Sequence, residues 1–360
     1  MNTYGSHRCM EPTSLREPLN EASLDMANHR VTGFYDNYYG HELHSLHEVL
    51  DYIRGQGKKT IFLAGDSSLD NKNWFEDKAK ACNGYEKILD KKISKCDVAY
   101  HLNRSLADRK DTEYVALNCA VEEASIGQKG CMKLNDHDIF IRDNIREDDI
   151  LVVSIGGNDI ALSPSVCTGL NTLCLTRCIP SFCLKMGCGA PIPCDDYCAG
   201  CCTSSMSNLT AFPPSFGYFL HLFGPRVQDY LKRLTSGPHP PRQVLICCIY
   251  YVDEMQTGSW ADTVLGYVGY NKDPSQLQLL TRLVFKYATS KISLPNSELT
   301  PVPLFTVLDG KDSSDYCERV EPSSQGGAKM AQLILKGIAT RRAGMLDDFH
   351  EHESQTMNRL

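Results

Sequence analysis

The stretch TIFLAGDSSLDNKNW, residues 60–74, determines how the chain is expected to fold. Its first four residues are apolar or β-branched and predict a buried strand, and the Ala-Gly pair that ends in Gly65 permits a sharp turn directly after it. Asp66 and Ser67 then fall at the carboxyl end of that strand, which in an open α/β sheet is the edge at which ligands bind. A serine there is a candidate nucleophile, although Gly-Asp-Ser alone is more often a helix cap.

A second apolar run, DILVVSI at residues 149–155, repeats this arrangement and predicts a central strand. The run ends in a turn made of Gly156, Gly157, Asn158 and Asp159. The two glycines permit a tight turn, which would hold the Asn158 amide where its N–H groups can point toward a substrate oxygen. Without Ser67, a plain turn residue would be the better interpretation of Asn158.

Composition and charge exclude several classes of protein. The chain has 360 residues, 42% of them apolar, which is enough for one large domain or two small ones. Its formal charge is −7 and it has no long basic run, so we expect no nucleic-acid partner. No stretch approaches the roughly 20 apolar residues that span a bilayer, and the first residues lack the apolar core of a signal peptide. We therefore expect no transmembrane segment and a cytoplasmic location.

We expect one domain over residues 41–340, between a flexible N-terminal segment, 1–40, and a polar C-terminal tail, 341–360. Apolar spacing predicts helices at 41–53, 77–90, 225–234, 277–292 and 330–338. It predicts strands at 60–63, 97–101, 113–118, 149–155, 243–250 and 302–308. The segment 251–270, rich in glycine and tyrosine, is predicted to be an irregular loop that walls a pocket.

The two turns together resemble the SGNH, or GDSL, hydrolase superfamily of esterases and lipases. The motif GDSSLDN at residues 65–71 is similar to its first block, and GGND at 156–159 is similar to its third. The resemblance covers roughly residues 58–340. It implies a three-layer α/β/α fold with a mainly parallel, flavodoxin-like sheet and a serine that attacks an acyl carbonyl. It implies no required cofactor.

In that family the serine N–H, a second-block glycine N–H and the third-block asparagine amide form the oxyanion hole, which here implies Ser67, Asn158 and a residue of NCAVEEAS at 118–125. The glycine expected near the middle of this second block is matched by Glu123. A backbone N–H survives such a substitution. The carboxylate, however, would oppose an oxyanion beside it unless the side chain turns away.

The resemblance also implies a fourth block, D-x-x-H-P-S, in which histidine takes the serine proton and aspartate orients the histidine. Here Glu321 occupies the histidine position and Glu318 the aspartate position, and no histidine lies between His239 and His350. A free glutamate is a poor base at neutral pH, but burial or a shared proton between two carboxylates raises its pKa. A Ser67–Glu321 dyad is therefore conceivable.

Other arrangements remain open at this point. The missing base could come from His101, or from His350 or His352 in the tail. Alternatively, Glu321 could form an ion pair with Arg319 or Lys329, and the chain would then be no efficient hydrolase.

The segment 164–210 is predicted to be a cysteine-rich insertion, because nine cysteines fall between residues 167 and 202. Four of them are spaced closely enough to hold a tetrahedral zinc ion: Cys194, Cys198, Cys201 and Cys202. Disulfides that staple a polar loop, or a reduced thiol-rich lid, are the alternatives. The residues do not decide among these three.

The predicted function is hydrolysis of an ester or acyl bond in a small-molecule substrate through Ser67. Two alternatives come from the same residues. Loss of the histidine favours a non-catalytic module that binds an acyl or carbohydrate ligand, and interception of an acyl-enzyme by an alcohol would make the chain an acyltransferase.

Overall fold

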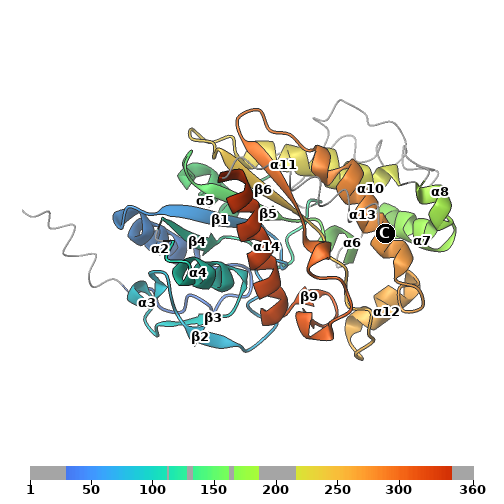
Figure 1. Ribbon diagram of the computed structural model, residues 1–360, viewed down its shortest axis with the longest axis horizontal. Coiled ribbons are helices and arrows are strands. Elements are labelled where there is room, and N and C mark those ends of the chain that lie inside the picture. The colour runs from blue at the N-terminus through green and yellow to red at the C-terminus, as the bar shows by residue number, and fades with distance from the viewer. Residues whose placement is uncertain (1–29, 112, 128–132, 162–165, 186–215, 343–360) are drawn as a thin grey trace, which may run out of the picture.

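The computed structural model describes residues 30–111, 113–127, 133–161, 166–185 and 216–342 (Figure 1). A five-stranded sheet forms the middle layer, and its strands are β1 (Lys59–Gly65), β4 (Tyr114–Asn118), β5 (Ile150–Ser154), β6 (Gln243–Cys248) and β7 (Glu298–Pro303). All neighbours pair in parallel, in the order β4-β1-β5-β6-β7. With the strands counted along the chain this is the flavodoxin-like order 2-1-3-4-5. The predicted α/β architecture is confirmed.

Helices cover both faces of the sheet. One face carries α4 (Val98–Asp108) and α14 (Ser324–Arg342), which lie side by side at the front of Figure 1. The other face carries α2 (Leu43–Gly55), α5 (Asp136–Asn144) and α11 (Val227–Leu234), with α13 (Ser275–Tyr287) beyond them. Strand β1 shows why the sheet needs both layers, because its alternate side chains enter the two cores.

Shorter elements complete the chain. The remaining helices are α3 (Tyr85–Ile88), α6 (Asn158–Ala161), α7 (Val166–Arg177), α8 (Ser181–Lys185), α10 (Gly217–His221) and α12 (Trp260–Tyr267). A π-helical turn spans Leu222–Arg226, and 3-10 turns span Thr289–Lys291, Leu304–Thr306 and Ser313–Asp315. Two small antiparallel pairs join β2 (Lys78–Lys80) to β3 (Ile93–Lys95), and β8 (Tyr316–Cys317) to β9 (Glu321–Pro322).

The register of the sheet places three turns at one edge. Leu63 lies opposite Asn118, and Gly65 lies opposite Ser154. The turns that follow β1, β4 and β5 therefore leave the sheet together at its carboxyl edge, as the two Gly-containing motifs predict.

Several predicted elements are wrong or displaced. The predicted strand at 97–101 is the first turn of α4, because the Asp97 carboxylate caps that helix by accepting the Tyr100 N–H at 2.7 Å. The predicted helix at 77–90 is mostly strand and turn, with only α3 helical. The predicted loop at 251–270 contains α12. Strand β7 begins before the predicted range 302–308, since an edge strand tolerates its two prolines.

The domain boundaries can be compared with the structure only in part. Residues 31–40, which fall in the predicted N-terminal segment, contact the domain: Val31 bridges to Leu89, and Val31 and Phe34 are buried. Of the predicted insertion, α7 and α8 are described, whereas the four candidate zinc ligands lie outside the described residues. The zinc, disulfide and free-thiol alternatives for that segment therefore stay predictions. Within the described ranges, no helix combines the length and apolar character needed to cross a bilayer.

The close approach of β1 to β5 predicts that Gly65 tolerates no side chain. Its φ is +128°, and a Cβ atom there would lie 1.7 Å from the Ser154 carbonyl oxygen. We expect Gly65→Ala to lower the free energy of unfolding by at least about 2 kcal/mol in urea titrations, because the turn must move. Gly169→Ala is the matched control, since no atom lies within 4 Å of the added Cβ. Equal stability of the two variants would contradict the constraint.

Candidate active site

The structure brings Ser67 and Glu321 together although 254 residues separate them in the chain. The Ser67 hydroxyl donates a hydrogen bond to Oε1 of Glu321 at 3.0 Å. Both residues are almost completely buried, at 4% and 5% exposed. The second carboxyl oxygen of Glu321 is buried and has no hydrogen-bond partner among the described residues. This carboxyl group therefore depends on Ser67 for its one hydrogen bond.

Side-chain hydrogen bonds fix the turn that carries Ser67. The Asp66 carboxylate accepts the Ser68 N–H at 3.1 Å and the Ser68 hydroxyl at 2.6 Å. The same hydroxyl lies 2.6 Å from the hydroxyl of Ser154, at the end of β5. The turns after β1 and β5 are thus held to each other, and the Ser67 side chain is left free to face Glu321.

Two contacts hold the backbone on either side of Glu321. The Asn71 side chain donates to the Pro322 carbonyl oxygen at 3.0 Å, and the Tyr250 hydroxyl donates to the Val320 carbonyl oxygen at 2.8 Å. Asn71 belongs to the same motif as Ser67, so the GDSSLDN stretch supplies both the hydroxyl and an anchor for its partner.

A tight turn precedes Glu321. Glu318 and Arg319 both have positive φ, at 49° and 69°. The Arg319 guanidinium group is buried and donates to the Asp253 carbonyl oxygen and to the side chains of Asp262, at 2.7 Å, and Asn271, at 2.8 Å. Glu321 is not among the described partners of this guanidinium group. The alternative in which Arg319 pairs with Glu321 is therefore wrong, because its guanidinium group anchors the turn to α12 instead.

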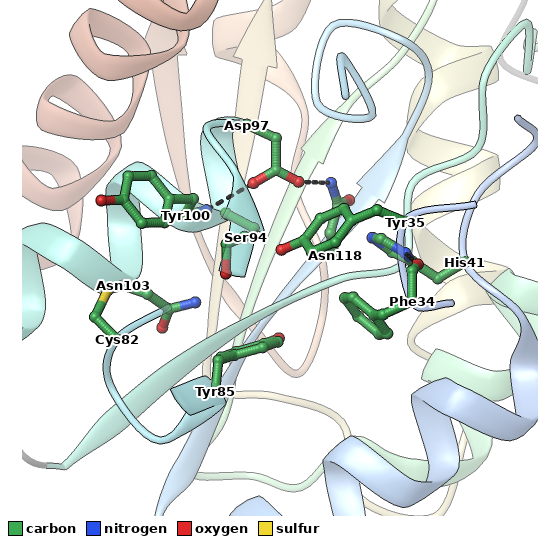
Figure 2. Close-up of a pocket in the computed structure, with 11 residues that line it drawn as sticks. Phe34, Tyr35, His41, Cys82, Tyr85, Ser94, Asp97, Tyr100, Asn103 and Asn118 are labelled. Atoms are coloured by element: carbon green, nitrogen blue, oxygen red, sulfur yellow. Dashed lines mark hydrogen bonds between the residues drawn. The ribbon is translucent and has the colours of Figure 1, made fainter. Parts of the chain in front are cut away.

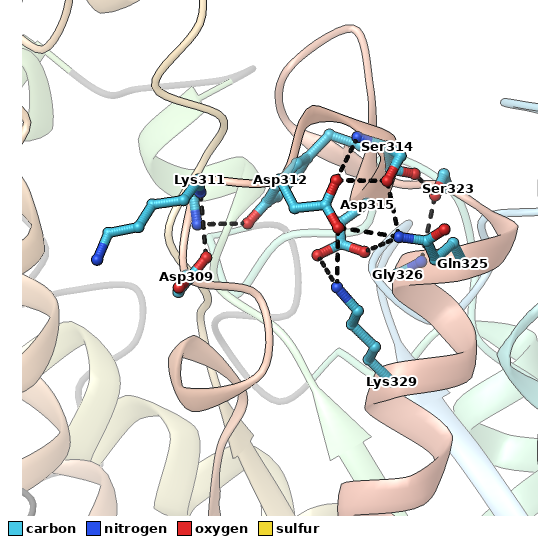
Figure 3. A network of polar contacts seen from close by, with 11 residues as sticks. Asp309, Lys311, Asp312, Ser314, Asp315, Ser323, Gln325, Gly326 and Lys329 are labelled. Atoms are coloured by element: carbon cyan, nitrogen blue, oxygen red, sulfur yellow. Dashed lines mark hydrogen bonds and ion pairs between the residues drawn. The ribbon is translucent and has the colours of Figure 1, made fainter.

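A polar network holds the other end of this loop, at the start of α14 (Figure 3). Lys329 contacts the carboxylates of Asp315, at 2.6 Å, and Asp312, at 3.3 Å. The Ser323 N–H donates to the Asp315 carbonyl oxygen at 2.9 Å, and Gln325 donates to the same two aspartates. Pairing of Lys329 with Glu321 is therefore also wrong, because Asp312 and Asp315 neutralise Lys329.

The other predicted bases lie elsewhere or outside the described residues. The Glu318 side chain is exposed, and a hydrogen bond to this residue goes to its backbone carbonyl, from Ser259. The structure does not bring it to Glu321. His101 lies on α4, with Nε2 at 3.2 Å from the Ser324 hydroxyl. The histidines of the tail, at positions 350 and 352, fall in the range that is not described.

Glu122 is a site residue that the sequence analysis missed. It is 2% exposed, its Oε1 accepts the Trp74 indole N–H at 3.2 Å, and its Oε2 has no hydrogen-bond partner among the described residues. Its N–H donates to Asp70 at 3.1 Å, which places it beside the GDSSLDN turn. The sequence feature that could have indicated it is the pair Glu122-Glu123 in the second block. Only Glu123 was considered, because it matches the family's glycine position.

Burial controls the charge state of these carboxyl groups. Burial raises the pKa of Glu321 to about 8; the Ser67 hydrogen bond opposes this rise, and the charges of Asp66 and Asp70 add to it. Burial, followed by the charge of Glu321, raises the pKa of Glu122 to about 9. Glu122 is therefore protonated and neutral at pH 7. Asp70 is balanced by Lys72, which is buried in contact with it.

Asn158 and Asp159 fasten the third block to the second. The Asn158 amide group donates one hydrogen bond, to the Ala124 carbonyl oxygen at 3.0 Å. The Asp159 carboxylate accepts the N–H groups of Ile126 and Gly127, both at 2.7 Å. An amide nitrogen carries two hydrogens, so one hydrogen of Asn158 remains for a ligand in the cavity that this residue lines.

Glu123 adopts the backbone conformation that a glycine at this position would suit. Its φ is +59°, and its exposed side chain turns toward Tyr39, whose hydroxyl lies 3.4 Å from the carboxylate. The N–H groups of Ser67 and Glu123 have no hydrogen-bond acceptor within the described ranges. Of the three residues expected to hold an oxyanion, Ser67 and Asn158 line the same cavity, whereas Glu123 is not among the described residues that line it.

Ser67, Asn158 and Glu321 line a cavity of about 370 Å³. The rest of its wall comes largely from α7, α12 and α13. Trp260 and Tyr267 of α12 are part of this wall, in the segment where the sequence predicts pocket aromatics. The site thus consists of a polar sheet edge that faces a wall of helices.

A second cavity lies on the α4 side and is structural (Figure 2). It measures about 10 Å³, room for about one water molecule. Its Asp97 carboxylate caps α4 and accepts the Asn118 side chain at 3.3 Å, which ties the second block to that helix. His41 stacks on Phe34 there, and burial keeps its pKa well below the usual range, so the ring is neutral. In the described part of the chain, no three His, Cys, Asp or Glu side chains are grouped to bind a metal.

The raised pKa of Glu321 predicts how stability depends on pH. In the unfolded chain this carboxyl group ionises near pH 4.5, but in the folded protein only near pH 8, so ionisation favours the unfolded state between these values. We expect Glu321→Gln to be as stable as the wild type near pH 4 and more stable above it. The difference should grow by up to about 1.4 kcal/mol per pH unit and level off above pH 8. Urea titrations across pH would measure this, and a constant difference would argue against a buried ionising carboxyl.

Comparison with known proteins gives only distant similarities. No protein-family model matches the chain, and no curated protein matches it significantly. Among solved structures, a lipase/acylhydrolase from Enterococcus faecalis is 12% identical with a TM-score of 0.40, over 79% of this chain and 96% of that one. An acetyl xylan esterase from Geobacillus stearothermophilus is 13% identical with a TM-score of 0.40, over 78% and 94%. A carbohydrate acetylesterase from Sinorhizobium meliloti is 12% identical with a TM-score of 0.36, over 79% and 99%. At these values the similarities assign no activity to this chain.

Proposed function

We propose that this chain is a serine hydrolase that cleaves an ester or acyl bond of a small molecule through Ser67. The observation that carries the proposal is the hydrogen bond from the Ser67 hydroxyl to the buried Glu321 carboxyl group at the wall of an open cavity. A nucleophile beside a base, within 3.0 Å and facing a cavity, is the arrangement that covalent catalysis requires.

In the first step, Ser67 Oγ forms a bond to the acyl carbon while its proton passes to Oε1 of Glu321. The π electrons of the carbonyl move to its oxygen. A carboxylate with a pKa of about 8 is a stronger base than a free glutamate and is matched to neutral or slightly alkaline pH. Glu122 stays protonated over most of this range, so it adds no charge beside the base.

The developing oxyanion would be stabilised by the N–H groups of Ser67 and Glu123 and by the free amide hydrogen of Asn158. Such a donor is worth roughly 3 kcal/mol to a transition state. The Glu123 carboxylate turns away toward Tyr39, which lessens its repulsion of the oxyanion.

In the second step, Glu321 returns its proton to the leaving oxygen as the ester C–O bond breaks, which leaves an acyl group on Ser67. Water then gives a proton to Glu321 and attacks the acyl carbon. Glu321 returns that proton to Ser67 Oγ as the bond between Oγ and the acyl carbon breaks, which releases a carboxylic acid and restores the serine. If an alcohol replaces water in this step, the product is a new ester. Acyl transfer is therefore the alternative outcome of the same intermediate.

This mechanism predicts the activity of three variants on p-nitrophenyl esters. We expect Ser67→Ala and Glu321→Gln to lower kcat/KM by at least about 100-fold, because each removes a partner of the proton transfer. The wild-type rate should rise up to tenfold per pH unit below about pH 8 and level off above it, since only ionised Glu321 accepts the proton. Glu318→Gln removes an equal charge from an exposed neighbour in the same loop and should retain full activity.

Three results would count against the mechanism: a pH profile that is flat between pH 6 and 9, equal loss in the Glu318 and Glu321 variants, or full activity of Ser67→Ala. If the wild type is inert on a broad ester panel and a fluorophosphonate does not label Ser67, a binding module becomes the better hypothesis.

The strained backbone at residue 123 gives a separate prediction. We expect Glu123→Gly to raise the free energy of unfolding by up to about 1 kcal/mol, because glycine adopts positive φ without strain. It should also raise kcat/KM a few-fold at low salt, since a carboxylate near the oxyanion is lost. Lys92→Gly, at an exposed position with φ of +51°, is the control that should gain stability without a change in rate. Equal rates for Glu123→Gly and the wild type would contradict an effect of the Glu123 carboxylate on the oxyanion.

A further inference from the structure

We propose that the helical part of the cavity is a subsite for a straight aliphatic acyl chain longer than acetyl. That the bound chain is an acyl group rests on the proposed function, whereas the apolar character of the subsite follows from the side chains of the wall. Its main side chains are Ile160, Leu173, Val264, Leu265, Val268 and Leu277. Ile160 belongs to α6, Leu173 to α7, Leu277 to α13, and the other three to α12 or the residue that follows it. All of them line the cavity that Ser67 also lines.

Three polar side chains of the described wall use their hydroxyl groups in hydrogen bonds within the protein. The hydroxyls of Thr172 and Thr281 donate to carbonyl oxygens one turn earlier in their own helices, at 2.8 and 3.2 Å. The Tyr250 hydroxyl donates to a backbone carbonyl oxygen at 2.8 Å. A ligand rich in hydroxyl groups would therefore find few partners along this wall and would be buried with unpaired groups. A hydrocarbon chain has no polar group that would be left unpaired there.

Large apolar side chains at the rim are exposed to solvent. Leu173 is 40% exposed, Trp260 39%, Val264 38% and Tyr267 70%. All four line the same cavity, so their exposed apolar surface is gathered around one opening. An acyl chain that leaves Ser67 between α7 and α12 would cover them, and removal of this surface from water would favour binding.

The cavity is held open in advance. The Arg177 guanidinium group, at the end of α7, donates to the carbonyl oxygens of Gly266, at 2.8 Å, and Tyr267, at 3.0 Å. This contact fixes the distance between α7 and α12 without any ligand. A preformed apolar cavity spares the cost of ordering its walls when the chain binds.

Apolar space continues beyond this wall. A smaller cavity of about 20 Å³ shares Ile160, Thr172 and Leu277 with the first and is bounded by Phe219 and Phe223. None of the described residues that line it is charged. The side chains behind Ile160 and Leu277 are thus apolar as well.

Gly169 offers a way to block the subsite. It lies on α7, lines the cavity, and has no atom within 4 Å of an added Cβ. Gly169→Phe would add a ring at the cavity wall, at a position where the Cβ atom itself meets no neighbour. Leu170→Phe adds a ring at the next residue, which is 48% exposed and does not line the cavity, and is the matched control.

The first experiment measures kcat/KM for p-nitrophenyl acetate, butyrate, octanoate and decanoate. We expect the wild-type value to rise by up to about fourfold per buried methylene as the chain lengthens. Gly169→Phe should lower the ratio of decanoate to acetate at least tenfold, and Leu170→Phe should keep it. If Gly169→Phe fails to fold, Val264→Trp at the exposed rim is a second obstruction with the same expected loss. A preference for acetate in the wild type, or an unchanged ratio in every obstructing variant, would overturn the subsite.

The second experiment needs no turnover. The chain has two tryptophans, and Trp260 lies in the cavity wall whereas Trp74 does not, so Trp260 emission should change saturably on titration with 1-decanol below its solubility limit. Trp260→Phe should lose this signal, Gly169→Phe should weaken decanol binding at least tenfold, and ethanol should give no saturable change. Absence of decanol binding would overturn the subsite whatever the esterase assays give. Decanol binding without ester hydrolysis would overturn the proposed hydrolase and leave the subsite in place.

Discussion

The buried carboxyl group of Glu321 is the constraint on which the rest of the site depends. With one hydrogen bond, from Ser67, and little solvent, its ionised form is disfavoured, and burial raises its pKa to about 8. Such a group stays in place only if its surroundings hold it firmly. The buried Arg319 guanidinium anchors the backbone before it, Asn71 anchors the backbone after it, and the Lys329 network fixes the start of the next helix. This burial lowers the free energy of unfolding at neutral pH, and the same burial makes the carboxylate a stronger base.

The cations near the site neutralise other acids and leave Glu321 without a counter-ion. Lys72 is buried against Asp70, Arg319 bonds Asp262, and Lys329 bonds Asp315. An ion pair at Glu321 would have held its pKa low and made it a poor base. Histidine would have needed no such arrangement, because its ordinary pKa already lies near neutrality. A carboxyl group could act as a base in that position only where no cation pairs with it, and none of the described Lys or Arg side chains forms an ion pair with Glu321.

The parts of the fold that depend on local pattern could be predicted, and the parts that depend on distant partners could not. The apolar run and Gly65 predict β1 and its turn, and the SGNH resemblance pairs that turn with residue 321. The segment at 97–101 is predicted to be a strand because its five residues are too few to show a helical or a strand period. The helix begins there because the Asp97 carboxylate caps it. Likewise α12 depends on the Ser259 cap and on the Arg319 contact to Asp262, 57 residues away. Glu122 was missed because its burial under Trp74 is a tertiary property.

The apolar wall and the strength of the base are two consequences of the same exclusion of water. The side chains that would receive an acyl chain, such as Val264 and Leu265, border the cavity into which Ser67 and Glu321 face. A chain bound there would exclude solvent from the cavity that Glu321 lines, which would raise the pKa of the carboxyl group further and strengthen its hydrogen bond to Ser67. A short acyl group would leave more of the cavity open to solvent. The length of the acyl chain would then act on the chemical step as well as on binding, because it changes the dielectric around the proton that moves.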